Sequence, residues 1–220
     1  MKRIPEPELM LSDAQAQAYA YADFEAPHAM FIDLFKRYFP NEAIAGQVVD
    51  LGCGPADISR RFAQAFPACH IDAVDASEVM LAYGQGIIAE YGLSQRIRLI
   101  QGYLPGVQLP QQHYDIVIAN SLLHHLADPQ VLWHTVKALA QPQAPVFIMD
   151  LVRPETRRQA EIMLQRYAEH EPQILRQDFF NSLLAAYRID EIQEQIEQAG
   201  LEELTVHEVS DRHFIVVGRG

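Results

Sequence analysis

Short apolar runs alternate with segments of helical spacing through the central part of the chain. The apolar runs, each short enough for one buried strand, occupy residues 47–51, 70–75, 97–102, 114–120 and 145–150. Apolar side chains recur at helical spacing in segments between these runs, at residues 56–66, 77–91 and 128–140. Because strands that are apolar throughout are covered on both faces, this alternation predicts a parallel sheet with helices on either side.

Two helices are predicted before the first strand. Ser12 followed by Gln15 is typical of a capping box, which would open a helix over residues 13–24. A second helix is predicted to begin near Pro27 and to end before Pro40, with apolar side chains at helical spacing between them.

The last third of the chain has a different pattern. Residues 155–170 and 190–199 predict helices, and residues 171–186 are mixed. Two further strands, 204–209 and 213–217, are joined by three residues, which indicates an antiparallel hairpin. No linker or repeat separates these parts, so we predict one domain over residues 1–220.

Composition and charge narrow the classes of partner. The net charge of −12 argues against a nucleic acid, which needs a basic face, and against an anionic membrane surface. No run reaches the ~20 apolar residues of a spanning helix, and the basic start is followed by Pro5 instead of a signal peptide. Cys53 and Cys69 lack the spacing of a metal site. We therefore expect a cytoplasmic protein without a metal.

A glycine turn after the first strand is the clearest functional feature. Residues 48–57 read VVDLGCGPAD, in which Gly52 and Gly54 let the backbone turn sharply beneath a ligand. Asp75 ends the second strand, where its carboxylate could bind a ribose diol or cap the next helix. In a dinucleotide-binding fingerprint the position of Asp57 is a glycine, and a carboxylate there would repel a pyrophosphate.

Three motifs together resemble the class I S-adenosylmethionine-dependent methyltransferases. They read VDLGCGPADIS, AVDASEVML and YDIVIANSLLHHL, and the resemblance covers about residues 45–155. It is closest to the small-molecule group that includes ubiquinone and menaquinone methylases. It implies a Rossmann-like, doubly wound α/β fold with a seven-stranded, mostly parallel sheet. The expected parts are a helical lid (1–45), a cofactor-binding core (46–152), acceptor-pocket helices (153–200) and a C-terminal hairpin (201–220).

The resemblance also implies how S-adenosylmethionine would be bound. The cofactor-binding candidates are Asp50, Gly52, Cys53, Gly54, Asp75, Ala76, Gln101, Gly102, Tyr103, Asn120 and Leu123. Asp50 would lie near the ammonium group and Asp75 at the ribose. Tyr103 stands where the family usually has an acid that contacts the adenine amino group, and Gln101 could supply a polar group instead.

Catalytic and acceptor residues carry weaker signals. His124 and His125 follow the fourth strand and are candidate general bases, although a structural role for one of them is equally compatible with the motif. The candidate acceptor residues are Tyr21, Arg153, Asp178 and Asn181. Tyr19 and Tyr21 point to different sides of a helix, so one of them could face the site. Arg153 could instead form an ion pair, and Asp178 or Asn181 could cap a helix.

The sequence thus predicts methyl transfer from S-adenosylmethionine to a small-molecule acceptor. The alternative is a module that binds S-adenosylmethionine or S-adenosylhomocysteine without turnover. The acceptor and the oligomeric state stay open, and a homodimer is compatible with the sequence.

Overall fold

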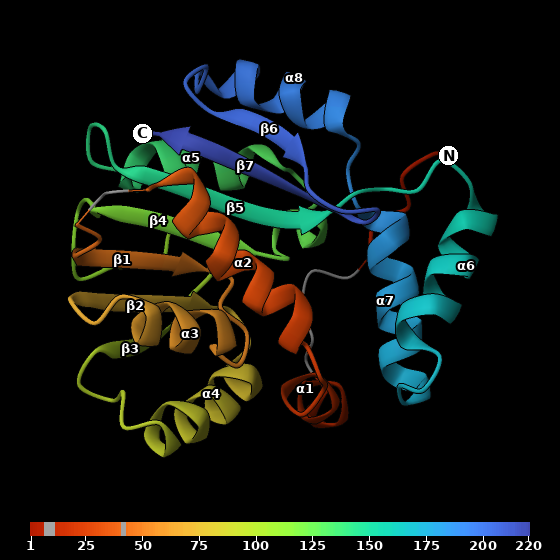
Figure 1. The fold of residues 1–220 in the computed structure, drawn as a ribbon, viewed down its shortest axis with the longest axis horizontal. Helices are drawn as coiled ribbons and strands as arrows, with labels where there is room; N and C mark the ends of the chain where they lie inside the picture. Colours follow the sequence, from red (N-terminus) through yellow and green to blue (C-terminus); the bar gives the residue numbers. More distant parts are fainter. Residues whose placement is uncertain (7–11, 41–42) are drawn as a thin grey trace.

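The computed structural model describes residues 1–6, 12–40 and 43–220. Its centre is a seven-stranded sheet in the order β3-β2-β1-β4-β5-β7-β6 (Figure 1). The strands that run parallel are β1 (Gly46–Leu51), β2 (Cys69–Asp75), β3 (Ile97–Gln101), β4 (Ile116–Asn120) and β5 (Pro145–Leu151). Strand order reverses between β1 and β4, and the crevice at such a reversal is where open α/β sheets bind ligands.

The C-terminal hairpin completes the sheet. β6 (Thr205–Glu208) and β7 (His213–Arg219) pair with each other in antiparallel register, and β7 pairs antiparallel with β5. The predicted doubly wound, mostly parallel sheet with an antiparallel C-terminal hairpin is therefore confirmed.

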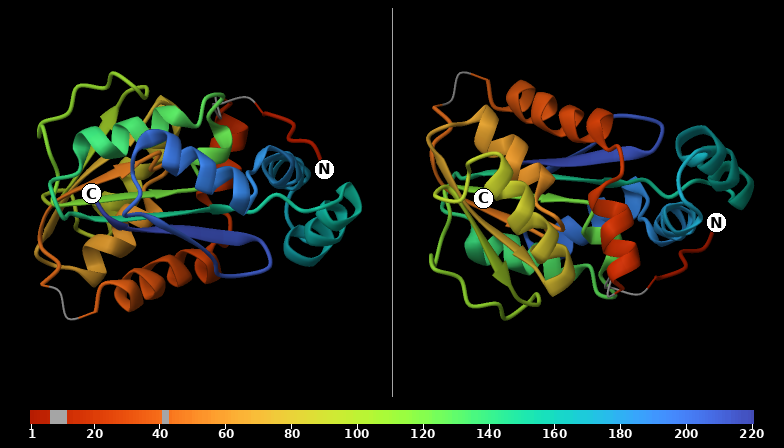
Figure 2. Two further views of the ribbon diagram at one scale, coloured as in Figure 1. Left: turned by 90° about the horizontal axis from the view of Figure 1, so that it is seen from above. Right: turned by 90° about the horizontal axis from the view of Figure 1, so that it is seen from below.

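Helices cover both faces of the sheet, as Figure 2 shows. On one face lie α2 (Glu25–Tyr38), α3 (Asp57–Ala65) and α4 (Glu78–Glu90), which share an apolar cluster with the sheet. On the other face, α5 (Gln130–Leu139) and α8 (Ile189–Ala199) form a second cluster that contains Trp133 and Phe214. The two clusters explain why the central strands are apolar on both sides.

Two helices extend beyond the carboxyl ends of the parallel strands (Figure 1). α6 (Arg157–Ala168) and α7 (Gln173–Ala185) share a small apolar cluster that includes Ala160, Leu183 and Leu184. The sequence left residues 171–186 mixed because polar side chains interrupt the apolar spacing of α7 before its buried end. None of the described helices is long and apolar enough to cross a membrane.

The first N-terminal helix is shorter than the sequence predicted, and the second, α2, begins two residues earlier than predicted. α1 (Asp13–Ala20) begins after Ser12, whose hydroxyl accepts a hydrogen bond from the backbone N–H of Gln15 at 3.2 Å. It ends at Ala20 instead of residue 24. The carboxylate of Asp23 accepts from the backbone N–H of Glu25 at 3.0 Å, an Asx turn that separates α1 from α2.

Residues 1–6 lie against the same end of the sheet. The guanidinium of Arg3 donates to the backbone carbonyls of His124, Leu126 and Ala185 at 2.6–3.1 Å. These bonds join the start of the chain to the loop after β4 and to the end of α7.

Candidate functional site

A cavity of about 370 Å³ opens at the carboxyl ends of β1, β2 and β4. Its walls are the β1–α3 turn, the ends of β2 and β4 and the residues that connect α1 to α2. The volume lies within the range of small-molecule sites, roughly 300–1,000 Å³. The cavity therefore coincides with the crevice that the strand order predicts.

The glycine turn forms the floor of the cavity. Gly52 and Gly54 adopt φ angles of 71° and 53°, which few residues other than glycine accept. A Cβ atom at Gly52 would lie 2.7 Å from the side chain of Leu122, so a larger residue could not be placed there without movement. The backbone N–H groups of Gly52 and Cys53 both donate to the carbonyl of Val74, which fixes the turn against β2.

Asp75 ties the turn to the end of β2. Its two carboxylate oxygens accept hydrogen bonds from the backbone N–H groups of Gly54 and Ser77, each at 2.8 Å. Burial raises the pKa of this carboxyl, and the bonds from Ser77, Gly54 and Ala76 partly offset that effect. Each oxygen keeps a further lone pair that a ligand hydroxyl could use.

Two polar oxygens in the cavity wall lack a partner among the described residues. Asp50 is 1% exposed, and its Oδ2 accepts from the Ser59 hydroxyl at 2.5 Å, but its Oδ1 has no hydrogen bond. The buried Oδ1 of Asn120 also has none. Burial raises the pKa of Asp50 to about 7; the Ser59 bond lowers it and the charge of Asp75 raises it. Buried oxygens without partners suit a cationic or hydrogen-bond-donating ligand.

Most of the cofactor-binding candidates line the cavity. They are Asp50, Gly52, Cys53, Gly54, Asp75, Ala76, Gly102, Tyr103 and Asn120. Two candidates lie elsewhere: Gln101 is exposed at the end of β3, and Leu123 is buried in the apolar cluster beneath α5. The neighbouring Leu122 lines the cavity in place of Leu123.

The two candidate histidines have different surroundings. His124 is 3% exposed and lies outside the cavity wall, with its Nδ1 at 2.5 Å from the Asp150 carboxylate. Burial lowers the pKa of His124, but the charges of Asp150 and Glu6 and the Asp150 hydrogen bond outweigh it and raise the pKa overall. His125 lines the cavity. An acceptor in the cavity would thus meet His125 rather than His124.

None of the four acceptor candidates lines the cavity in the part of the chain that the structure describes. Tyr21 is 76% exposed and faces Tyr83 of α4. Arg153 is buried and pairs with Glu191 at 2.6 Å, instead of with Asp150 or Glu155. The reason is that Val152 pairs with Tyr187 just before α8, which brings Arg153 beside Glu191.

The other two acceptor candidates lie on α7. Asp178 accepts from the Gln15 amide of α1 at 3.1 Å, and Asn181 accepts from Gln177 at 2.8 Å. Neither side chain caps a helix, since both lie within α7.

Residues from α1 and α2 take their place at the cavity. Tyr19, Phe24 and His28 all line it. Tyr19 lies three positions after Ala16, which is fully buried, so the two share the inner face of α1 and Tyr21 does not. That spacing is the signal in the sequence that could have separated the two tyrosines. Burial, with the charges of Asp150, Asp57 and Asp75, raises the pKa of Tyr19 to about 12.

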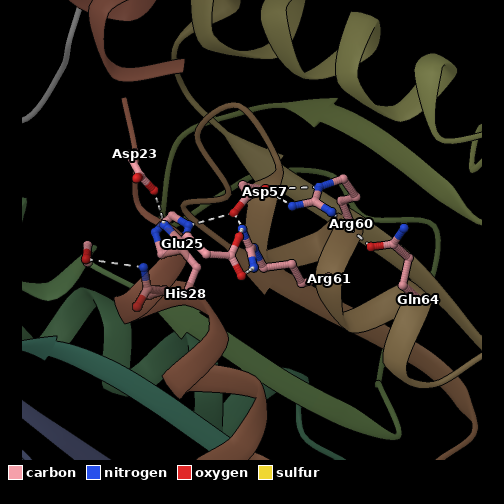
Figure 3. Close-up of polar contacts among 9 residues, drawn as sticks. Asp23, Glu25, His28, Asp57, Arg60, Arg61 and Gln64 are labelled. Carbon is pink, nitrogen blue, oxygen red and sulfur yellow. Dashed lines mark hydrogen bonds and ion pairs between the residues drawn. The ribbon is translucent and has the colours of Figure 1, made fainter. Parts of the chain in front are cut away.

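Asp57 is neutralised by the protein itself, as Figure 3 shows. Its carboxylate contacts Nδ1 of His28 at 2.7 Å, Nε of Arg61 at 2.6 Å and the guanidinium of Arg60. Burial raises the pKa of Asp57, but these hydrogen bonds outweigh it and hold the pKa well below its ordinary range. The sequence argument that the carboxylate of Asp57 would repel a pyrophosphate is therefore corrected.

Comparisons with known proteins show what the central part of the chain and the fold are similar to. A family model described as a methyltransferase domain matches residues 48–143. The matched residues contain the glycine turn, Asp75 and the loop after β4, so this part of the chain is similar to a methyltransferase domain. The structure aligns with a SAM-dependent methyltransferase from Aquifex aeolicus with a TM-score of 0.66 at 18% identity, covering 95% of this chain and 98% of that one.

Two curated relatives show how far the likeness in sequence extends. A release factor glutamine methyltransferase from Gloeobacter violaceus is 38% identical over 84 residues, which is 37% of this chain and 28% of the relative. A malonyl-[acyl-carrier protein] O-methyltransferase from Bacillus anthracis is 27% identical over 112 residues, covering 50% of this chain and 38% of the relative. The chain therefore spans well under half the length of these relatives, whose names specify unlike acceptors.

Replacing Asp57 by asparagine should destabilise the fold in a pH-dependent way. Its pKa is depressed in the folded state, so the ion pairs stabilise above the unfolded-state value of about 4 and are lost as pH falls further. We expect Asp57→Asn to lower the free energy of unfolding in urea by about 1–3 kcal/mol at pH 7. The gap to the unmodified protein should narrow below about pH 4.

The matched control is Asp33→Asn, which removes the same charge from an exposed position on α2. It should change the free energy of unfolding by less than about 0.5 kcal/mol. An Asp57→Asn gap that persists undiminished at pH 3 would contradict the charge-based explanation.

Proposed function

We propose that this protein transfers the methyl group of S-adenosylmethionine to a small-molecule acceptor. The observation that carries the proposal is the pair of buried oxygens without partners, Asp50 Oδ1 and Asn120 Oδ1, at the rim of the glycine turn. S-adenosylmethionine has an ammonium group and a sulfonium, which such oxygens would stabilise. A pyrophosphate held at the Gly52–Gly54 turn would instead be repelled by the ionised carboxylate of Asp50.

The residues present fit each part of this cofactor. The Gly52–Gly54 turn would hold the methionine part, with Asp50 and Asn120 at its ammonium group. Asp75 would accept from the ribose hydroxyls. Ala76 and Tyr103, which line the cavity beyond Asp75, would lie along the adenine. The cofactor supplies an activated methyl group, and the protein's part is to align it with the acceptor and to exclude water.

Several features favour a small molecule as the acceptor. The cavity is covered on one side by α1, which contacts α4 through Asp13 and Tyr83 (3.2 Å) and α7 through Gln15 and Asp178. Such a cover admits a small molecule more readily than a folded protein. The curated relative that methylates a protein glutamine matches only 37% of this chain, so its acceptor does not carry over.

Methyl transfer can be tested without knowing the acceptor. Incubation with methyl-labelled S-adenosylmethionine and a cell extract should move label into the fraction of small molecules. Label confined to protein precipitates would overturn the small-molecule acceptor. Tight S-adenosylhomocysteine binding with no labelled product from any extract would favour a binding module instead.

Affinity for S-adenosylhomocysteine should rise with pH around neutrality. The pKa of Asp50 is about 7 in the free protein, and only the ionised carboxylate attracts an ammonium group. Between pH 6 and pH 8 the ionised fraction rises about tenfold, so we expect the Kd to fall by about tenfold. Titration calorimetry over this range measures the change.

A truncated ligand and a variant isolate the contribution of Asp50. Methylthioadenosine has no ammonium group, so its Kd should stay flat over the same pH range. Asp50→Asn should weaken S-adenosylhomocysteine and remove the pH dependence. Equal pH slopes for the two ligands would exclude Asp50 as the ammonium partner.

Asp75 should affect both ligands alike, because both carry the ribose. We expect Asp75→Ala to weaken S-adenosylhomocysteine and methylthioadenosine by about 1–3 kcal/mol each, through lost charge-assisted hydrogen bonds. Glu202→Ala, exposed and outside the cavity wall, is the control and should leave both Kd values unchanged. An unchanged Kd for Asp75→Ala would refute the ribose assignment.

A further inference from the structure

A carboxylate and two imidazoles meet beside the cavity. Oε1 of Glu6 lies 3.5 Å from Nε2 of His124 and 3.3 Å from Nδ1 of His125. The three potential ligand atoms all lie within 4.8 Å of one another. The side chains of this Glu6–histidine cluster are 9%, 3% and 18% exposed, so the group is largely removed from water.

Asp150 fixes the orientation of His124. Its Oδ1 takes the Nδ1–H of the imidazole at 2.5 Å, and its Oδ2 accepts from the backbone N–H of His124 at 3.3 Å. The Nε2 atom of the ring then faces a Glu6 oxygen at 3.5 Å, where either a proton or a metal ion can lie between them. Histidines that bind metals commonly donate their other ring N–H to a carboxylate in this way.

One divalent cation explains the geometry better than two protons. The rings of His124 and His125 lie with their centroids 4.1 Å apart, so protonating both would place two like charges side by side. Ligands bound to Zn²⁺ at about 2.0–2.1 Å in a tetrahedral arrangement are about 3.3–3.4 Å apart. The two distances to Glu6, 3.3 and 3.5 Å, match that separation.

The charges around the cluster also favour a cation. Glu6 contributes one negative charge to the cluster, and the carboxylates of Asp150 on β5 and Asp178 on α7 add two nearby. The guanidinium of Arg3 is the positive charge that opposes them. When both imidazoles are neutral, the net charge of these buried and half-buried groups is negative. Ser182 donates to Oε1 of Glu6 at 3.1 Å, which holds the carboxylate in position.

We propose that Glu6, His124 and His125 bind one Zn²⁺ ion beside the cavity, with Asp150 orienting His124. The role of this Zn²⁺ ion in catalysis rests on the proposed function. A hydroxyl acceptor would take the fourth position on Zn²⁺ and lose its proton to water. The oxygen would form the new bond to the methyl carbon, and the electron pair of the broken carbon–sulfur bond would stay on sulfur.

Metal binding is measured directly, with neither cofactor nor acceptor present. After treatment with a chelator, calorimetry with Zn²⁺ should show one ion per chain, and Zn²⁺ should raise the Tm of the protein. Glu6→Gln and His125→Asn should each weaken Zn²⁺ binding by at least about 100-fold, since each removes a ligand. Co²⁺ in place of Zn²⁺ should give the visible absorption of a tetrahedral site, and Glu6→Gln should abolish it.

His134→Asn is the matched control, because this histidine is exposed on α5, outside the Glu6–histidine cluster. It should leave the Zn²⁺ affinity unchanged. Stoichiometric binding that survives Glu6→Gln and His125→Asn, or no stoichiometric binding at all, would overturn the metal site. S-adenosylhomocysteine binding by Glu6→Gln, measured in parallel, shows that the variant is folded and tests the cofactor site separately.

Discussion

Two backbone N–H groups that donate to the Asp75 carboxylate hold the ligand end of the sheet together. Through Gly54 they fix the β1–α3 turn, and through Ser77 they fix the start of α4. The carbonyl of Val74 binds the same turn from β2. The turn is therefore anchored to its neighbouring strand before any ligand binds. Binding of a ligand then does not have to supply the free energy of ordering the turn.

The acidic residues near the cavity fall into two groups that differ in their partners. Asp57 has its charge balanced by Arg60, Arg61 and His28, so it stabilises the packing of α2 on α3. Asp50 and Asp75 accept hydrogen bonds but contact no cationic side chain among the described residues. The charge of Asp57 is thus balanced within the protein. The negative charge that a ligand in the cavity would meet comes from Asp50 and Asp75. A cationic nucleoside fits this arrangement, and the basis for it is Asp50 and Asp75 rather than Asp57.

The sequence predicted the sheet and most of the cavity wall because both depend on local patterns. Short apolar runs define the strands, and a glycine turn followed by an acid at the next strand end defines the wall. Leu123 was misplaced by one position because a short 3-10 turn, Leu123–His125, turns it into the core and leaves Leu122 at the cavity. The sequence favoured Tyr21 over Tyr19 because it does not show that Ala16 is buried. That burial defines the inner face of α1. Periodicity gives a helix its faces but does not say which one meets the site.

The acceptor side could not be predicted because contacts between distant segments build it. Arg3 reaches the carbonyls of the loop after β4 from more than a hundred residues away, and Glu6 reaches the two histidines there. The pattern around residues 1–6 gives no sign of these partners, since a lone arginine and a lone glutamate are common on any surface. The cofactor half is local to β1, β2 and β4 and matches relatives with unlike acceptors. The N-terminal segment and the loop after β4 meet only in the folded chain, so this contact is where the acceptor preference of this protein would be determined.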